Sequence, residues 1–130
     1  MIKISLSPLA GLAAAAALAL SPTTAMAHAK LVASTPAANA KVAKVTSILL
    51  QFSEKLIAST VKAELVMTGM PGMADHPPMK IAIASAMGKD GKSLTLTPKR
   101  ALVPGTYTVK WSAAGADTHR MGSEFSFTVK

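Results

Sequence analysis

The sequence predicts an all-β domain, an antiparallel β-sandwich or small barrel of about seven strands. Three observations support this fold class. Short runs alternate apolar and polar residues or are rich in β-branched residues, glycine and proline turn signals separate these runs, and no stretch has the apolar period of an amphipathic helix. Many short strands between frequent turns are typical of sandwiches and barrels.

The first half of the domain is expected to begin with two strands. The run 29–35 is the first, and it ends at Pro36 because proline cannot donate a hydrogen bond to a sheet ladder. The small and polar residues 37–44 predict a connecting loop, and the β-branched and apolar residues 45–52 predict the second strand. Residues 54–60 have no regular pattern and are expected to form a turn or a short irregular segment.

Five further strands are expected in the rest of the chain. Residues 61–67 alternate between apolar and polar side chains and lead directly into a methionine-rich segment. The later strands are predicted over 80–87, 93–97, 106–112 and 122–129, with Asp-Gly and Pro-Gly turn signals among the connections.

The first 27 residues have the pattern of a secretory signal peptide. Lys3 supplies a short positive region, residues 9–20 contain only Leu, Ala and Gly, and an A-x-A pattern ends at Ala27. Cleavage after Ala27 would leave residues 28–130 as a single exported domain. No other apolar run approaches the length of a membrane span, so no transmembrane segment is expected in the mature chain.

The composition excludes two classes of function. The formal net charge is +8, but the lysines are scattered and the aromatic residues are few, which argues against a nucleic-acid-binding surface. The chain contains no cysteine, so metal sites built from thiolates are excluded and stability must come from packing.

One segment concentrates four thioethers and one imidazole, carried by Met67, Met70, Met73, His76 and Met79. Glycine and proline interrupt it, so it is expected to be a loop with no core to fill. Thioethers are soft ligands that favour Cu(I), and an imidazole can join them. The alternative interpretation is a partly buried hydrophobic loop or a methionine-rich surface for protein contacts.

A second candidate metal site combines His28, Asp117 and His119. Cleavage after Ala27 would make His28 the amino-terminal residue, whose free amine and imidazole can chelate one ion. In an extended segment Asp117 and His119 point to the same side of the chain, and the resulting nitrogen and oxygen set suits Cu(II). The alternatives are that His28 is an accident of cleavage and His119 an ordinary loop residue.

These motifs together resemble the CopC/PcoC family of periplasmic copper-resistance proteins over essentially the whole mature domain. The matching residues occur in the family's order: His28-Ala29-Lys30-Leu31, Ser34-Thr35-Pro36, Phe52-Ser53-Glu54, the Met67–Met79 segment, Pro104-Gly105-Thr106-Tyr107, Val109, Trp111 and Asp117-Thr118-His119. The resemblance implies a periplasmic protein with a cupredoxin-like (Ig-like) Greek-key β-barrel and two separate copper sites.

The resemblance also implies which residues bind copper. His28, Asp117 and His119 would hold Cu(II), and a subset of the methionine-rich ligands would hold Cu(I). Glu54 aligns with a family glutamate and is considered only as an outer-shell residue of the Cu(II) site. Arg120-Met121 depart from the family's usual Pro-Ile and add a charge and a thioether next to His119 in the sequence.

The first functional hypothesis is a non-enzymatic periplasmic carrier that sequesters copper for resistance or homeostasis. It would transfer copper to an inner-membrane transporter of the CopD type, as a monomer or as a copper-bridged dimer. Copper would move between the two sites, or between molecules, when its oxidation state changes. Two alternatives are a copper monooxygenase-like enzyme using the amino-terminal histidine and a structural β-sandwich module.

Overall fold

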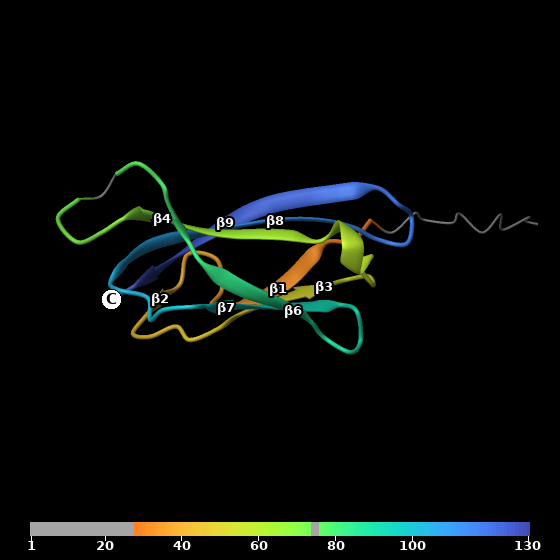
Figure 1. Ribbon diagram of the computed structural model, residues 1–130, viewed down its shortest axis with the longest axis horizontal. Coiled ribbons are helices and arrows are strands. Elements are labelled where there is room, and N and C mark those ends of the chain that lie inside the picture. Colours follow the sequence, from red (N-terminus) through yellow and green to blue (C-terminus); the bar gives the residue numbers. More distant parts are fainter. Residues whose placement is uncertain (1–27, 74–75) are drawn as a thin grey trace, which may run out of the picture.

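The computed structural model describes residues 28–73 and 76–130, so the expected signal peptide, residues 1–27, lies outside the described residues. Two β-sheets pack face to face in an elongated sandwich (Figure 1). The elements in chain order are β1 (Leu31–Thr35), β2 (Lys41–Val42), β3 (Ile48–Phe52), the 3-10 helix η1 (Ala58–Thr60), β4 (Lys62–Gly69), β5 (Met79–Ile81), β6 (Ile83–Met87), β7 (Ser93–Pro98), β8 (Gly105–Ala114) and β9 (Arg120–Val129).

The strand order is β1-β3-β7-β6 in the four-stranded sheet and β2-β9-β8-β4-β5 in the five-stranded sheet. Every named pair is antiparallel except β2 with β9, which is parallel. The predicted all-β sandwich is therefore confirmed. Among the described residues, no helix is long and apolar enough to span a membrane.

In the described part of the chain nine strands form where about seven were expected, and both additional strands have a physical reason. The segment 37–44 contains β2, whose two residues pair with Thr128 and Val129 at the edge of β9, a long-range contact that a two-residue run does not reveal. The predicted strand 80–87 begins one residue earlier and divides at Ala82 into β5 and β6. These two strands belong to different sheets, so the chain crosses from one layer to the other at this point.

The core lies between the two sheets and contains side chains from both layers. Its largest fully buried side chains include Tyr107, Phe127, Leu50 and Leu94. The ring of Trp111 is also buried, and it meets Phe52 of the opposite sheet edge to face with centroids 4.9 Å apart. Such aromatic pairs stabilise a core beyond the area that they bury. The long strands β8 and β9 contribute the buried side chains of Tyr107, Trp111 and Phe127 to this core, and they pair with each other along their whole length.

Candidate metal sites

The first cluster, His28 with Asp117 and His119, lies at the end of the sandwich where β1 begins and β8 turns into β9 (Figure 1). The His28 Nδ1 and Asp117 Oδ2 atoms are 2.7 Å apart, and the His119 Nδ1 is 3.6 Å from the same oxygen. The two imidazole rings have centroids 5.2 Å apart. One ligand atom from each residue lies within 4.8 Å of the others, so a single ion can contact all three after small side-chain adjustments.

Contacts of the next two residues, Ala29 and Lys30, hold His28 in place. Ala29 is completely buried against the backbone of Gly115, and Lys30 exchanges two hydrogen bonds with Ser53. The Lys30 N–H donates to the Ser53 Oγ at 3.0 Å, and the Ser53 N–H donates to the Lys30 carbonyl at 2.9 Å. The amino end of the domain is thereby fixed one residue after His28.

Asp117 and His119 converge through a turn, and the expectation of an extended segment is wrong. Thr118 between them has φ of 65°, the left-handed region that β-branched residues rarely adopt. Two hydrogen bonds stabilise the turn: the Thr118 N–H donates to the Gly115 carbonyl at 2.9 Å, and the His119 N–H donates to the Asp117 Oδ1 at 3.1 Å. The turn brings both side chains to His28.

The Asp117 carboxylate is the electrostatic centre of this cluster. Partial desolvation, the largest single influence, raises the pKa of Asp117. The hydrogen bonds from the His119 backbone and from the His28 ring, together with the charge of the two imidazoles, outweigh desolvation and lower the pKa below its usual value. Its side chain is only 9% exposed, so an anion is held among nitrogen ligands with little access to water.

The side chains of the two residues that follow His119 lie in different surroundings. The Arg120 Nη1 donates to the Ser112 Oγ at 2.8 Å, and Met121 pairs with Ala113 in the sheet and is half-buried against the core. Arg120 is therefore bound to β8 through Ser112, and Met121 is packed beside the core. Glu54 is half-buried, and its carboxylate is not among the ligand atoms that cluster with His28, Asp117 and His119.

The methionine-rich segment lies at the opposite end of the sandwich, between β4 and β5 (Figure 1). The expectation that the whole segment is a loop without a core to fill is wrong at both ends. Met67 belongs to β4 and is 3% exposed in the core, and Met79 begins β5 and is 54% exposed. Met67 and Met79 are directly paired across the two strands, so their side chains lie on the same face.

Met70 and Met73 form the tip of this segment. Each backbone N–H donates to the carbonyl of the other at 2.9 Å, and Pro71-Gly72 occupy the corner with Gly72 at φ of 80°. Proline followed by a glycine with positive φ is the signature of a type II turn. The two thioethers are 38% and 52% exposed, so they are accessible from solvent on a defined turn.

The backbone of His76 is hydrogen-bonded to β4, and one nitrogen of its ring has no hydrogen-bond partner among the described residues. Its N–H donates to the Thr68 carbonyl at 3.2 Å, and its ring Nδ1 is 2.8 Å from the Pro77 carbonyl. Because a carbonyl only accepts, Nδ1 is the donor in this hydrogen bond, and Nε2 is the ring nitrogen that remains to accept a hydrogen bond or to coordinate a metal. Within the described residues this Nε2 is buried and has no hydrogen-bond partner.

Comparisons with known proteins point to one family. The model of the CopC domain matches residues 31–130. The chain is 47% identical over 114 residues to copper resistance protein C of Xanthomonas campestris pv. juglandis, a match that covers 88% of this chain and 89% of that protein. It is 45% identical over 107 residues to copper resistance protein C of Escherichia coli, covering 82% of this chain and 85% of that protein.

Solved structures agree with this result. The crystal structure of PcoC, a methionine-rich copper resistance protein from Escherichia coli, matches with a TM-score of 0.73 and 42% identity over 80% of this chain and 100% of the other. CopC from Methylosinus trichosporium OB3b matches at 22% identity with a TM-score of 0.66, covering 79% of this chain and 94% of the other, and supports the fold alone.

Proposed function

The chain belongs to the CopC family, and on that premise we propose that it is a periplasmic copper carrier with one Cu(II) site and one Cu(I) site. Relatives that share about 45% identity with it are named as copper resistance proteins and not as enzymes. A resistance or homeostasis role requires only reversible binding and release of copper. The proposal includes export by a signal peptide cleaved after Ala27 and a monomeric mature domain.

One observation carries the proposal: His28 and Asp117, which are 89 positions apart in the sequence, meet with His119 so that the ligand atoms of all three lie within 4.8 Å of one another. Neighbouring ligands of a tetragonal ion, each about 2.0 Å from the metal, are about 2.8 Å apart. The 2.7 Å between His28 Nδ1 and Asp117 Oδ2 is close to that separation. After cleavage the amine of His28 would add a fourth ligand, and Cu(II) prefers such nitrogen and oxygen sets.

The methionine-rich end supplies the opposite ligand preference. Soft thioethers at Met70, Met73 and Met79 are exposed, and the bare Nε2 of His76 adds a borderline ligand. We assign Cu(I) to a subset of these ligands. Met67 differs from the others because its thioether is packed in the core, so its participation would require the segment to rearrange.

Copper transfer follows from the different ligand preferences of Cu(I) and Cu(II). Oxidation of Cu(I) makes the thioether site unfavourable and the nitrogen site favourable, and reduction of Cu(II) has the reverse effect. The expected acceptor is an inner-membrane transporter of the CopD type. Exposed thioethers favour transfer by ligand exchange because an acceptor can approach the ion while it is still bound.

Copper titration of two purified forms tests the proposal. One form begins at His28, and the matched control carries one additional alanine before His28. We expect tight Cu(II) binding only in the first form and equal Cu(I) binding in both. Equal Cu(II) affinity in the two forms would show that the amino-terminal chelate is wrong, and mass spectrometry of the exported protein checks that processing ends at His28.

A further inference from the structure

A groove of about 570 Å³ opens at the methionine-rich end of the sandwich. One wall is the crossover from β5 to β6, and the other is the loop that joins β7 to β8. Two hydrogen bonds fasten this loop: the Lys99 N–H donates to the Ala82 carbonyl at 2.9 Å, and the Tyr107 hydroxyl donates to the Val103 carbonyl at 2.6 Å. The first of these bonds joins the two walls, and the second ties the loop to β8.

The floor of the groove is apolar and its edges carry exposed apolar side chains. Met67 and Tyr107 form part of the floor and are 3% and 1% exposed. Met79 and Val103 are 54% and 56% exposed, although most apolar side chains of their size are buried in this domain. Concave apolar surfaces with polar groups at the margin are typical binding sites.

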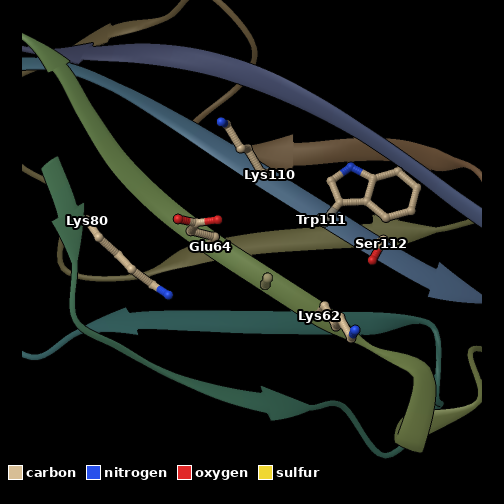
Figure 2. A pocket seen from close by; sticks show the side chains of 7 residues that line it. Lys62, Glu64, Lys80, Lys110, Trp111 and Ser112 are labelled. Atoms are coloured by element: carbon tan, nitrogen blue, oxygen red, sulfur yellow. The ribbon is translucent and has the colours of Figure 1, made fainter. Parts of the chain in front are cut away.

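Every charged residue that lines the groove is a cation, and they are Lys80, Lys99 and Arg100. No acidic residue is among its described lining residues. The hollow on the outer face of the five-stranded sheet is different: Figure 2 shows Lys62, Lys80 and Lys110 around the carboxylate of Glu64. Lys80 lines both hollows, whereas Lys99 and Arg100 line the groove with no acidic residue among its described lining residues, and these two cations favour an anionic partner.

The wall formed by β5 also offers backbone hydrogen-bonding groups. β5 is the outermost strand of its sheet, and within the described residues no strand pairs with its other side. A free strand edge next to pockets for alternate side chains is the arrangement by which domains bind extended peptides. Three independent features, the apolar floor, the cationic margin and the free edge, fit the same type of ligand.

We propose that this groove binds an extended peptide segment with alternating acidic and apolar residues, which pairs with β5. The identification of that segment as part of the copper-receiving protein rests on the proposed function, since Met79 belongs both to the groove and to the Cu(I) ligand candidates. Binding of the segment itself requires no copper. Docking here would place the acceptor next to the exposed thioethers.

A membrane surface fits the groove less well than a peptide. The apolar floor is recessed, and Met67 and Tyr107 are too deeply buried for a flat bilayer to contact. Alternate side chains of an extended chain project to one side and can enter such a groove. The observations therefore favour a peptide over anionic lipid.

The test is a titration of copper-free protein, residues 28–130 labelled with nitrogen-15, with a capped seven-residue peptide that alternates Glu and Val. We expect saturable chemical-shift changes confined to residues 79–82 and 99–103, and slower amide exchange in β5. The same peptide with Lys in place of Glu should bind at least about tenfold more weakly, because the charges at the groove would then repel it.

Two double variants distinguish peptide binding at the groove from a general effect of net charge. Lys99→Glu/Arg100→Glu should weaken binding of the acidic peptide about tenfold, whereas Lys89→Glu/Lys92→Glu, with the same change in net charge at the distant β6–β7 turn, should not. Equal losses in both variants, equal binding of both peptides, or shifts elsewhere would overturn the proposal. Tighter binding to phosphatidylglycerol vesicles through the same two cations would also overturn it, in favour of lipid. The copper titrations are independent of these outcomes.

Discussion

The two candidate copper sites differ in how the chain builds them. The His28, Asp117 and His119 cluster joins residues 89 positions apart through the packing of Ala29 on Gly115. The methionine-rich site consists of one contiguous segment between neighbouring strands β4 and β5. The first is held by contacts between distant segments, and the second exposes candidate thioether ligands on a turn and at the start of β5. This difference suits tight retention at one end and exchange at the other.

Their separation also limits how copper can move between them. Met67 pairs with Tyr107 near one end of β8, and the cluster follows Ala114 at the other. Seven residues at about 3.3 Å each place the two ends roughly 23 Å apart. A single ion cannot be bound by both ligand sets at once, so transfer from one site to the other requires release, a second molecule or a partner.

The largest effect is expected for His119→Ala. Loss of groups that only orient a metal ligand typically lowers affinity 10- to 100-fold, so loss of a direct ligand should lower Cu(II) affinity about 100-fold or more. Cu(I) affinity should not change, because the methionine-rich segment lies at the far end. Competition titrations with chelators of each oxidation state measure both affinities.

His76→Ala is the matched control for that experiment, since it removes an imidazole at the other end. It should weaken Cu(I) binding and leave Cu(II) binding unchanged. If either variant weakened both ions equally, the two regions would not be independent sites.

The next largest effect is expected on stability, and it should differ between two methionines of the same segment. Met67→Ala removes a buried thioether and should lower the free energy of unfolding by about 2 kcal/mol, the low end for core methionines because the site borders a groove. Met73→Ala changes a side chain that is 52% exposed and should alter stability by less than about 0.5 kcal/mol. Chemical denaturation without copper measures both values, and similar losses would contradict the distinction between core and exposed thioethers.

Acidification should affect the two ends unequally. Protons compete with Cu(II) for the amine and imidazole nitrogens, and each displaced proton costs about tenfold in affinity per pH unit, so Cu(II) affinity should fall about tenfold or more from pH 7 to pH 6. The lowered pKa of Asp117 lies below the ordinary value of 3.8, so its carboxylate stays ionised and does not cause this loss. Thioethers do not titrate, and Cu(I) binding should change much less. Parallel losses at both sites would exclude a thioether-dominated Cu(I) site.

The smallest effect is expected for Gly115→Ala, which tests how packing positions His28. A Cβ at this position would lie 3.3 Å from the Ala29 Cβ and 3.6 Å from the Asp117 Oδ1, so Ala29 must shift by a few tenths of an ångström. Cu(II) affinity should fall about three- to tenfold. Stability should change by less than about 1 kcal/mol, because alanine also lowers the entropy of the unfolded chain. An unchanged Cu(II) affinity would show that this contact does not position the histidine.

Much of the fold was predictable because alternation and turn signals act locally. The strands that contain Ile48, Tyr107 and Phe127 have alternating or continuous apolar patterns. Such a pattern predicts a strand even when the neighbouring strand in the sheet is unknown. The two-residue strand β2 and the sheet change at Ala82 were not predictable in this way, since both depend on which strand lies alongside.

Residue identity and spacing alone were enough to predict the all-β class, the family and the types of candidate ligand at both ends. Which of these side chains meet depends on how the two sheets pack. Packing places His28 next to Asp117 and buries Met67 while Met73 stays exposed. The turn at Thr118, whose φ is positive, brings His119 to the same cluster. The physical reason is that metal-site geometry and burial depend on contacts between residues distant along the chain, which packing of the two sheets establishes.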